Sequence, residues 1–166
     1  MTAKALREIV ERQEAKLRFE SFNNADALDL GMRIINIAKK EQLVIATDIV
    51  LNGFIVFRFA IEGTTRNNEL WMRNKRNTMM STGHASIHLA YKLAELGLPQ
   101  NEAYMPKTEF AVCGGGFPIF IKGSGVIGYA CVSGLHHEMD HRLLVKAISE
   151  KLGVELDEPV PIDTGF

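Results

Sequence analysis

The sequence predicts an α/β fold of the α+β type, a sandwich in which helices cover a mainly antiparallel sheet of about five strands. Two hairpins and the helical patterns around them support this prediction. Asn52-Gly53 lies between β-rich runs at 43–51 and 54–61, and an Asn-Gly pair favours the tight turn of a hairpin. Two further apolar runs, 117–121 and 126–132, are joined by a short segment that contains two glycines. Because hairpins produce antiparallel pairs, we expect one largely antiparallel sheet.

The N-terminal segment, residues 1–20, predicts an amphipathic helix. Long side chains recur at helical spacing between charged residues, at Leu6, Ile9, Val10, Gln13 and Leu17. Asn23-Asn24 then offers a side-chain cap for a second helix. Successive turns of that helix are expected to carry Leu28, Met32, Ile35 and Lys39.

The first strand, at 43–51, is nearly continuously apolar, so we expect it to be central with both faces covered. Residues 62–65 end the next strand. Asn67 or Asn68 is expected to cap a long helical region that extends to residues 95–97, and Gly83 is expected to kink or split it. A loop with two prolines follows at 98–108.

The second hairpin leads through Ser133-Gly134 into a helix predicted at 138–152. Gly153 is its expected C-terminal cap, because glycine adopts the left-handed conformation that ends many helices. The tail, 153–166, is expected to be extended and exposed. All of these elements fit one domain, 1–166, of ordinary globular composition, with 46% apolar residues.

The charge distribution excludes two classes of partner. The formal net charge is −1 and both signs are interspersed, which does not fit a nucleic-acid-binding surface. No apolar run approaches the roughly 18 residues of a membrane span. Because the N-terminal segment is charged throughout, it does not fit a secretory signal. We therefore expect a cytoplasmic protein, and free thiols at Cys113 and Cys131.

Glycine-rich backbone flanks the second hairpin. Gly114–Gly116 precede it, and bare backbone of this kind lets a flat or anionic ligand approach closely. The candidate ligand-binding residues here are Gly115, Gly116, Phe117, Ser133 and Gly134. The alternative interpretation of the glycines is a bulge or a sharp turn.

Several segments in this order resemble the GlcG/HbpS-like family. They are GGGFPI, then G-x-G-V-I-G, then VSGL with Asp140-His141 shortly after, and NNELWMRNKRNT at 67–78. Members of this family are often labelled haem-degrading or haem-binding, and the agreement is closest to an uncharacterised cytoplasmic branch. The resemblance implies a profilin-like sandwich and haem as a cofactor. A homo-oligomer is expected from the amphipathic N-terminal helix and the exposed hairpin edges, which offer surfaces for association.

The third helical region carries a second set of ligand-binding candidates. They are Trp71, Arg73, Lys75 and Arg76. Cations beside an indole suit a planar anion, because the cations pair with carboxylates and the ring offers a stacking surface. The alternative interpretation is a solvated basic face, with Trp71 packed on the core.

Residues 137–141 have the sequence His-Glu-Met-Asp-His, the H-E-x-x-H pattern of zinc peptidases. Asp140 places a charge inside the motif, and a third ligand would have to come from the tail, so we do not expect a zinc peptidase. We instead expect Asp140 to accept hydrogen bonds in the first helical turn and His141 to be partly buried and hydrogen-bonded. The remaining alternative gives Asp140 and His141 a catalytic acid–base role.

His84 and His88 lie four residues apart and therefore share a helix face. They are candidate ligands for a metal or for haem iron, although a surface or subunit contact is the simpler interpretation. No catalytic set emerges from the sequence. The leading functional expectation is binding of haem or another planar anion. The alternatives are an oligomeric assembly protein without turnover, and a hydrolase or lyase that acts on a small acid.

Overall fold

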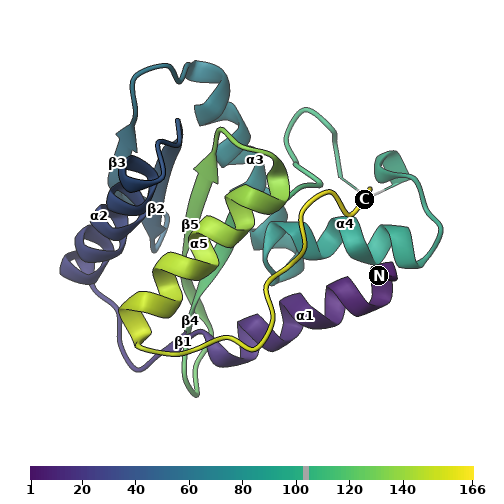
Figure 1. Ribbon diagram of the computed structural model, residues 1–166, viewed down its shortest axis with the longest axis horizontal. Helices are drawn as coiled ribbons and strands as arrows, with labels where there is room; N and C mark the ends of the chain where they lie inside the picture. Colours follow the sequence, from purple (N-terminus) through teal and green to yellow (C-terminus); the bar gives the residue numbers. More distant parts are fainter. Residues whose placement is uncertain (103–104) are drawn as a thin grey trace.

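The computed structural model describes residues 1–102 and 105–166 (Figure 1). In this part the chain forms helices and strands in the order α1 (Ala3–Lys16), β1 (Arg18–Phe19), α2 (Asn24–Lys40), β2 (Ala46–Leu51), β3 (Phe54–Ala60), α3 (Arg66–Thr82), α4 (Ser86–Glu95), a 3-10 turn (Gln100–Glu102), β4 (Gly116–Ile121), β5 (Val126–Ser133) and α5 (His137–Leu152). The predicted loop at 98–108 contains the 3-10 turn, and its residues 103–104 lie outside the described part.

The sheet has the strand order β1-β4-β5-β2-β3. Only the short β1 pairs in parallel, with β4, and the other described neighbours are antiparallel. Figure 1 shows α2 and α5 side by side over one face, with α3 behind the sheet and α1 packed along α4. The prediction of a mainly antiparallel sheet covered by helices is therefore confirmed.

Both predicted hairpins form. Asn52 and Gly53 have φ values of 51° and 80°, the left-handed conformations that a tight hairpin turn requires. All six residues of β2 are buried, so its expected central position is also confirmed. The first expected helix ends at Lys16 rather than continuing to residue 20, because the chain then turns to add β1 to the sheet.

The buried face of α2 differs from the one that was predicted. Asn23 caps the helix as predicted, with Asp26 completing a capping box. However, Leu28 and Met32 are 57% and 44% exposed. The buried residues are Ala27, Leu30, Gly31, Ile34, Ile35, Ile37 and Ala38. The Phe57 ring of β3 packs against Gly31, where a Cβ atom would collide with it, so the missing side chain brings the helix close to the sheet.

The long helical region divides at Gly83, as predicted, and this residue ends α3 with φ of 74°. The N-terminal cap of α3 lies two or three residues earlier than predicted. Thr65 caps α3, and Asn68 returns a hydrogen bond from its side chain to the Thr65 backbone. Asn68 thus belongs to the cap without being the cap residue.

The tail is not exposed along its length, which corrects the expectation. It crosses the molecule beside α5 towards α4 (Figure 1). Val160 is fully buried, and the Asp163 and Thr164 amides donate hydrogen bonds to the Glu138 carboxylate. Contacts that hold a tail in place lie far away in the sequence, so local composition does not reveal them. None of the helices in the described part has the length and apolar character needed to cross a membrane.

Candidate functional site

Two adjoining cavities, of about 430 and 300 Å³, lie where α3 faces the start of α5. Trp71, Cys113 and His137 line both of them. We call the combined space the Trp71 groove. Its other lining residues are Asn67, Asn68, Lys75, Gln100, Met105, Lys107, Phe110, Ala111, Val112, Ser133, Gly134, Leu135, Asp140 and Phe166. Both volumes fall in the usual range of small-molecule pockets.

A buried ion pair lies at the base of the groove. The Lys75 ammonium is 2.9 Å from Asp140 Oδ2 and donates to the Val132 carbonyl at 2.7 Å. Asp140 Oδ1 accepts from the Leu135 amide at 3.0 Å, as expected for a carboxylate in the first turn of a helix. Burial raises the pKa of Asp140, although Lys75 acts against this shift. Because Lys75 is already paired, it shapes the groove rather than offering a free charge.

Gly115 explains part of the glycine-rich sequence. Its φ is 105°, and a Cβ atom there would collide with the Lys75 ammonium and the Val132 carbonyl. The glycine therefore makes room for the buried ion pair. Gly116 begins β4, where its amide donates to the Ser86 hydroxyl at 3.0 Å.

His137 and Cys113 place two neutral donor groups on the groove wall. Burial lowers the pKa of His137, so its imidazole is neutral at pH 7. Its Nδ1 accepts a hydrogen bond from the Gly114 amide at 3.3 Å, which puts the proton on Nε2. Burial also raises the pKa of Cys113, which keeps it a thiol.

Aromatic rings and one exposed cation complete the groove. Trp71, Phe110 and Phe166 contribute rings, and Lys107 contributes an ammonium group. Trp71 itself is 44% exposed rather than packed in the core. Apolar walls with a few polar groups are typical of ligand pockets, and here they suit a flat molecule with an acidic group.

The structure brings together some of the predicted ligand-binding residues and separates others. Trp71, Lys75, Ser133 and Gly134 line the groove, and Gly115 lies against its base. The remaining candidates point elsewhere. Arg73 contacts Asn74 and the Thr108 carbonyl, Arg76 pairs with Asp48 at 3.0 Å, and Phe117 is fully buried in the core. The Asn67–Thr78 segment therefore supplies an aromatic wall but not a cluster of free cations.

Asp140 and His141 do not form an acid–base pair. The fully buried His141 ring places Nε2 2.8 Å from Gln13 Oε1, whereas Asp140 faces Lys75. Burial lowers the pKa of His141 to about 3, so the ring donates this hydrogen bond in its neutral form. Because His141 packs beside Phe117 in the core, it cannot join His137 in a zinc-peptidase site.

His88 lies on α4, whereas His84 precedes this helix, so contrary to expectation the two do not share a helix face, although both contact α1. Their rings stack with centroids 3.9 Å apart, and one nitrogen of each ring faces a carboxylate of α1. His84 Nδ1 is 2.8 Å from Glu14, and His88 Nε2 is 3.0 Å from Glu11. The hydrogen bond with Glu14 raises the pKa of His84, whereas burial lowers the pKa of His88. These contacts explain both histidines as parts of a helix–helix contact within the chain.

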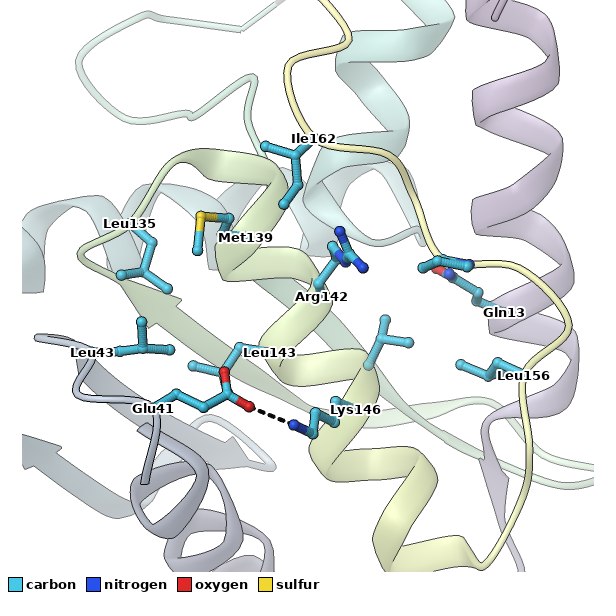
Figure 2. Close-up of a pocket in the computed structure, with 12 residues that line it drawn as sticks. Gln13, Glu41, Leu43, Leu135, Met139, Arg142, Leu143, Lys146, Leu156 and Ile162 are labelled. Atoms are coloured by element: carbon cyan, nitrogen blue, oxygen red, sulfur yellow. Dashed lines mark hydrogen bonds and ion pairs between the residues drawn. The ribbon is translucent and has the colours of Figure 1, made fainter. Parts of the chain in front are cut away.

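A separate cavity of about 460 Å³ lies between α5 and the tail. Figure 2 shows Met139 and Arg142 on α5 and Ile162 and Leu156 on the tail, while a Lys146–Glu41 ion pair of 2.5 Å lies at one side. This tail pocket is lined mainly by aliphatic side chains, together with Gln13, Glu41, Arg142 and Lys146. It contains no aromatic ring and none of the predicted ligand-binding residues.

Sequence reasoning missed Cys113, Lys107, Phe110 and His137 as groove residues. Cys113 directly precedes the glycine triplet, so its position beside a possible binding edge was a usable indication. Lys107 and Phe110 lie in an irregular loop that carries no periodic pattern. His137 was considered only as part of the H-E-x-x-H motif, which the fold breaks apart.

Comparisons with known proteins agree on the family and the fold. The family model described as haem degrading protein HbpS-like matches residues 22–149. A UPF0303 protein of Rhizobium rhizogenes is 37% identical over 144 residues, which cover 87% of this chain and 89% of that protein. The crystal structure of Ybr137w is 28% identical, covers 86% of this chain and 84% of its own, and has a TM-score of 0.79. The crystal structure of a PduOC:haem complex is 19% identical, covers 83% of this chain and 98% of its own, and has a TM-score of 0.65. This likeness shows the fold alone.

Proposed function

The chain belongs to the HbpS-like family of haem-degrading proteins, and on this premise we propose that it binds haem, or another planar ligand with acidic groups, in the Trp71 groove. One observation carries the proposal. Aromatic rings, an exposed ammonium and two neutral donor groups line two adjoining cavities that share Trp71, Cys113 and His137. The tail pocket has no comparable combination of groups.

The donor set of the groove fits a haem. Imidazole is a common axial ligand of haem iron, and His137 lies on the shared wall of the two cavities. Cys113 lies on the same wall as a neutral thiol, whereas cysteine ligates haem iron as a thiolate. In the bound state we assign the stacking surface to Trp71 and a carboxylate contact to Lys107. The PduOC complex, a protein of the same fold, carries haem, which supports the choice of ligand. Haem would bring redox chemistry to the groove, and its breakdown would require an external reductant and oxygen.

A haemin titration followed by visible spectroscopy tests this proposal. We expect a saturable shift of the Soret band at one equivalent, because the groove presents one set of donors. Trp71→Ala and Lys107→Ala should each weaken binding by roughly tenfold, the effect of losing about 1.4 kcal/mol of contact energy. His137→Ala should change the position of the band if the imidazole ligates the iron.

Two matched variants serve as controls. Arg73→Ala removes a cation that lies on α3 but outside the groove, and Arg142→Ala removes one from the tail pocket. Both should bind haemin like the unmodified protein. Weak, non-saturable binding that all variants share would overturn the proposal, and a loss confined to Arg142→Ala would transfer the site to the tail pocket.

Self-assembly is the second candidate function, and the edge strand β3 favours it. This strand lies at the edge of the sheet. Three of its apolar residues, Phe54, Ile55 and Phe59, are 70%, 38% and 46% exposed. A long apolar edge offers unpaired backbone groups to another strand, and soluble proteins usually block such edges with charges or prolines. We assign the partner as a second copy of the chain, paired through β3.

A further inference from the structure

Three consecutive residues at the start of α5 bring metal-ligating atoms together. His136, His137 and Glu138 each offer one such atom, and these atoms all lie within 4.8 Å of one another. The shortest separation that the structure gives, between His136 Nδ1 and Glu138 Oε2, is 3.3 Å. This set differs from the H-E-x-x-H motif, because His141 faces Gln13 inside the core and His136 replaces it.

The surroundings of Glu138 provide an independent indication of a cation. Its side chain is fully buried, and among the described residues it forms no ion pair with a lysine or arginine. Hydrogen bonds from the Asp163 and Thr164 amides and from the Thr164 hydroxyl hold its carboxylate in one orientation. A buried carboxylate is costly unless it is paired, and among the described residues only the His136 imidazole lies within ion-pair distance of it, at 3.3 Å.

We propose that His136, His137 and Glu138 bind a divalent transition-metal ion such as Zn²⁺. Two imidazoles and one carboxylate form a common three-residue ligand set for zinc, with a fourth position left for water or another ligand. Asp163 faces the other nitrogen of the His136 ring, with its Oδ1 3.9 Å from Nε2, so it is not counted among the ligands. Ligation by His137 needs a ring nitrogen with a free lone pair, so the metal would replace either the Nε2 proton or the Gly114 hydrogen bond to Nδ1.

The bound metal would also fasten the tail to α5. Glu138 already accepts hydrogen bonds from the Asp163 amide at 2.6 Å, from the Thr164 amide at 3.0 Å and from the Thr164 hydroxyl. A cation on the same carboxylate would fix its orientation and so strengthen the hold on the tail. His137 is also the candidate haem ligand, so its imidazole cannot bind both metals at once. Zinc binding is measured without haemin, so the two proposals can still fail separately.

Calorimetric titration of the EDTA-treated full chain with Zn²⁺, in the absence of haemin, tests the site. We expect one equivalent to bind. His136→Ala should weaken binding at least about tenfold, because it removes a direct ligand. Its side chain is half exposed, so the fold should tolerate the change. His84→Ala is the matched control, since it removes one partly exposed histidine from the α1–α4 contact and should leave zinc binding intact.

Two further measurements keep the test decisive. Glu138→Gln should also lose zinc, and circular dichroism must show that its helices are retained. Co²⁺ in place of Zn²⁺ should give visible bands without the near-ultraviolet band of a thiolate–cobalt bond, because Cys113 is not in the ligand set. The proposal is overturned by the absence of zinc binding, by binding that is indifferent to His136→Ala, by loss in His84→Ala instead, or by a thiolate band.

Discussion

At the scale of single residues, several buried polar side chains have a particular partner, although His141 Nδ1 has none among the described residues. Lys75 is held by Asp140 and His141 by Gln13, while Asp48 is held by Arg58 and Arg76. Burying a charge or a ring nitrogen costs free energy, and these contacts offset that cost. They also fix the orientation of the side chains that surround the groove.

Breaking the buried ion pair should destabilise the protein strongly. In Lys75→Met, Asp140 stays in the core without its cation, so we expect the free energy of unfolding in urea to fall by about 3–5 kcal/mol. The double variant Lys75→Met/Asp140→Asn leaves no unpaired charge and should recover a large part of this loss. A single variant with unchanged stability, or a double variant as unstable as the sum of the single changes, would contradict this account.

His141 should make the protein less stable in acid. The folded ring has a pKa of about 3, against 6.5 for an unperturbed histidine, so the unfolded chain binds a proton below pH 6.5 and the folded chain does not. The His141 contribution is therefore complete above pH 6.5 and diminishes as the pH falls. Between pH 7 and pH 5 the loss should be about 2 kcal/mol.

Urea unfolding of His141→Asn at both pH values measures this contribution. The stability difference between the unmodified protein and the variant should shrink by that amount at pH 5, and a constant difference would contradict the prediction. His84→Gln should behave in the opposite sense. The folded pKa of His84 is raised, so its contribution is present at low pH and is lost as the pH rises.

The sequence predicted the kind of role that Asp140 and His141 have, but not their partners. A carboxylate in a first helical turn is expected to accept hydrogen bonds, and Asp140 does so. Lys75 and Gln13, however, lie 65 and 128 residues away along the chain. Only the folded arrangement of α1, α3 and α5 brings them together, so local spacing alone could not have identified them.

At the scale of elements, turn residues were reliable guides and helix faces were less so. Asn52-Gly53, Gly83 and Gly153 mark the ends of elements where expected, because each adopts a left-handed conformation that few other residues adopt easily. The buried face of α2 was harder to predict. Its contact surface depends on Ala27 and Gly31, whose small side chains allow the sheet to approach but contribute little to an apolar pattern.

The edge strand β3 should control association. Phe59→Lys places a charge on the exposed edge, so we expect a smaller species in light scattering coupled to size-exclusion chromatography. Leu96→Lys is the matched control, because Leu96 is 60% exposed but follows α4, away from β3. Association that Phe59→Lys leaves intact, or that Leu96→Lys abolishes, would place the interface elsewhere.

At the scale of the whole molecule, the groove is assembled from distant parts of the chain. α3 supplies Trp71, the loop before β4 supplies Lys107 and Cys113, and α5 supplies His137. The family resemblance and the hairpins were sufficient to predict the fold. The groove depends on how these segments pack, so only Trp71, Lys75 and the residues around the glycines could be anticipated.

The two edges of the sheet are unequal. β3 presents a full strand, whereas the opposite edge consists of the two-residue β1, which pairs with β4 and follows directly after α1. If each subunit could pair at both edges of its sheet, copies would add without limit and form fibres. If two copies pair through β3, as proposed, each has used its one full edge strand and the assembly ends at two copies. In that case the short β1 strand acts as a chain terminator that prevents further growth at the opposite edge.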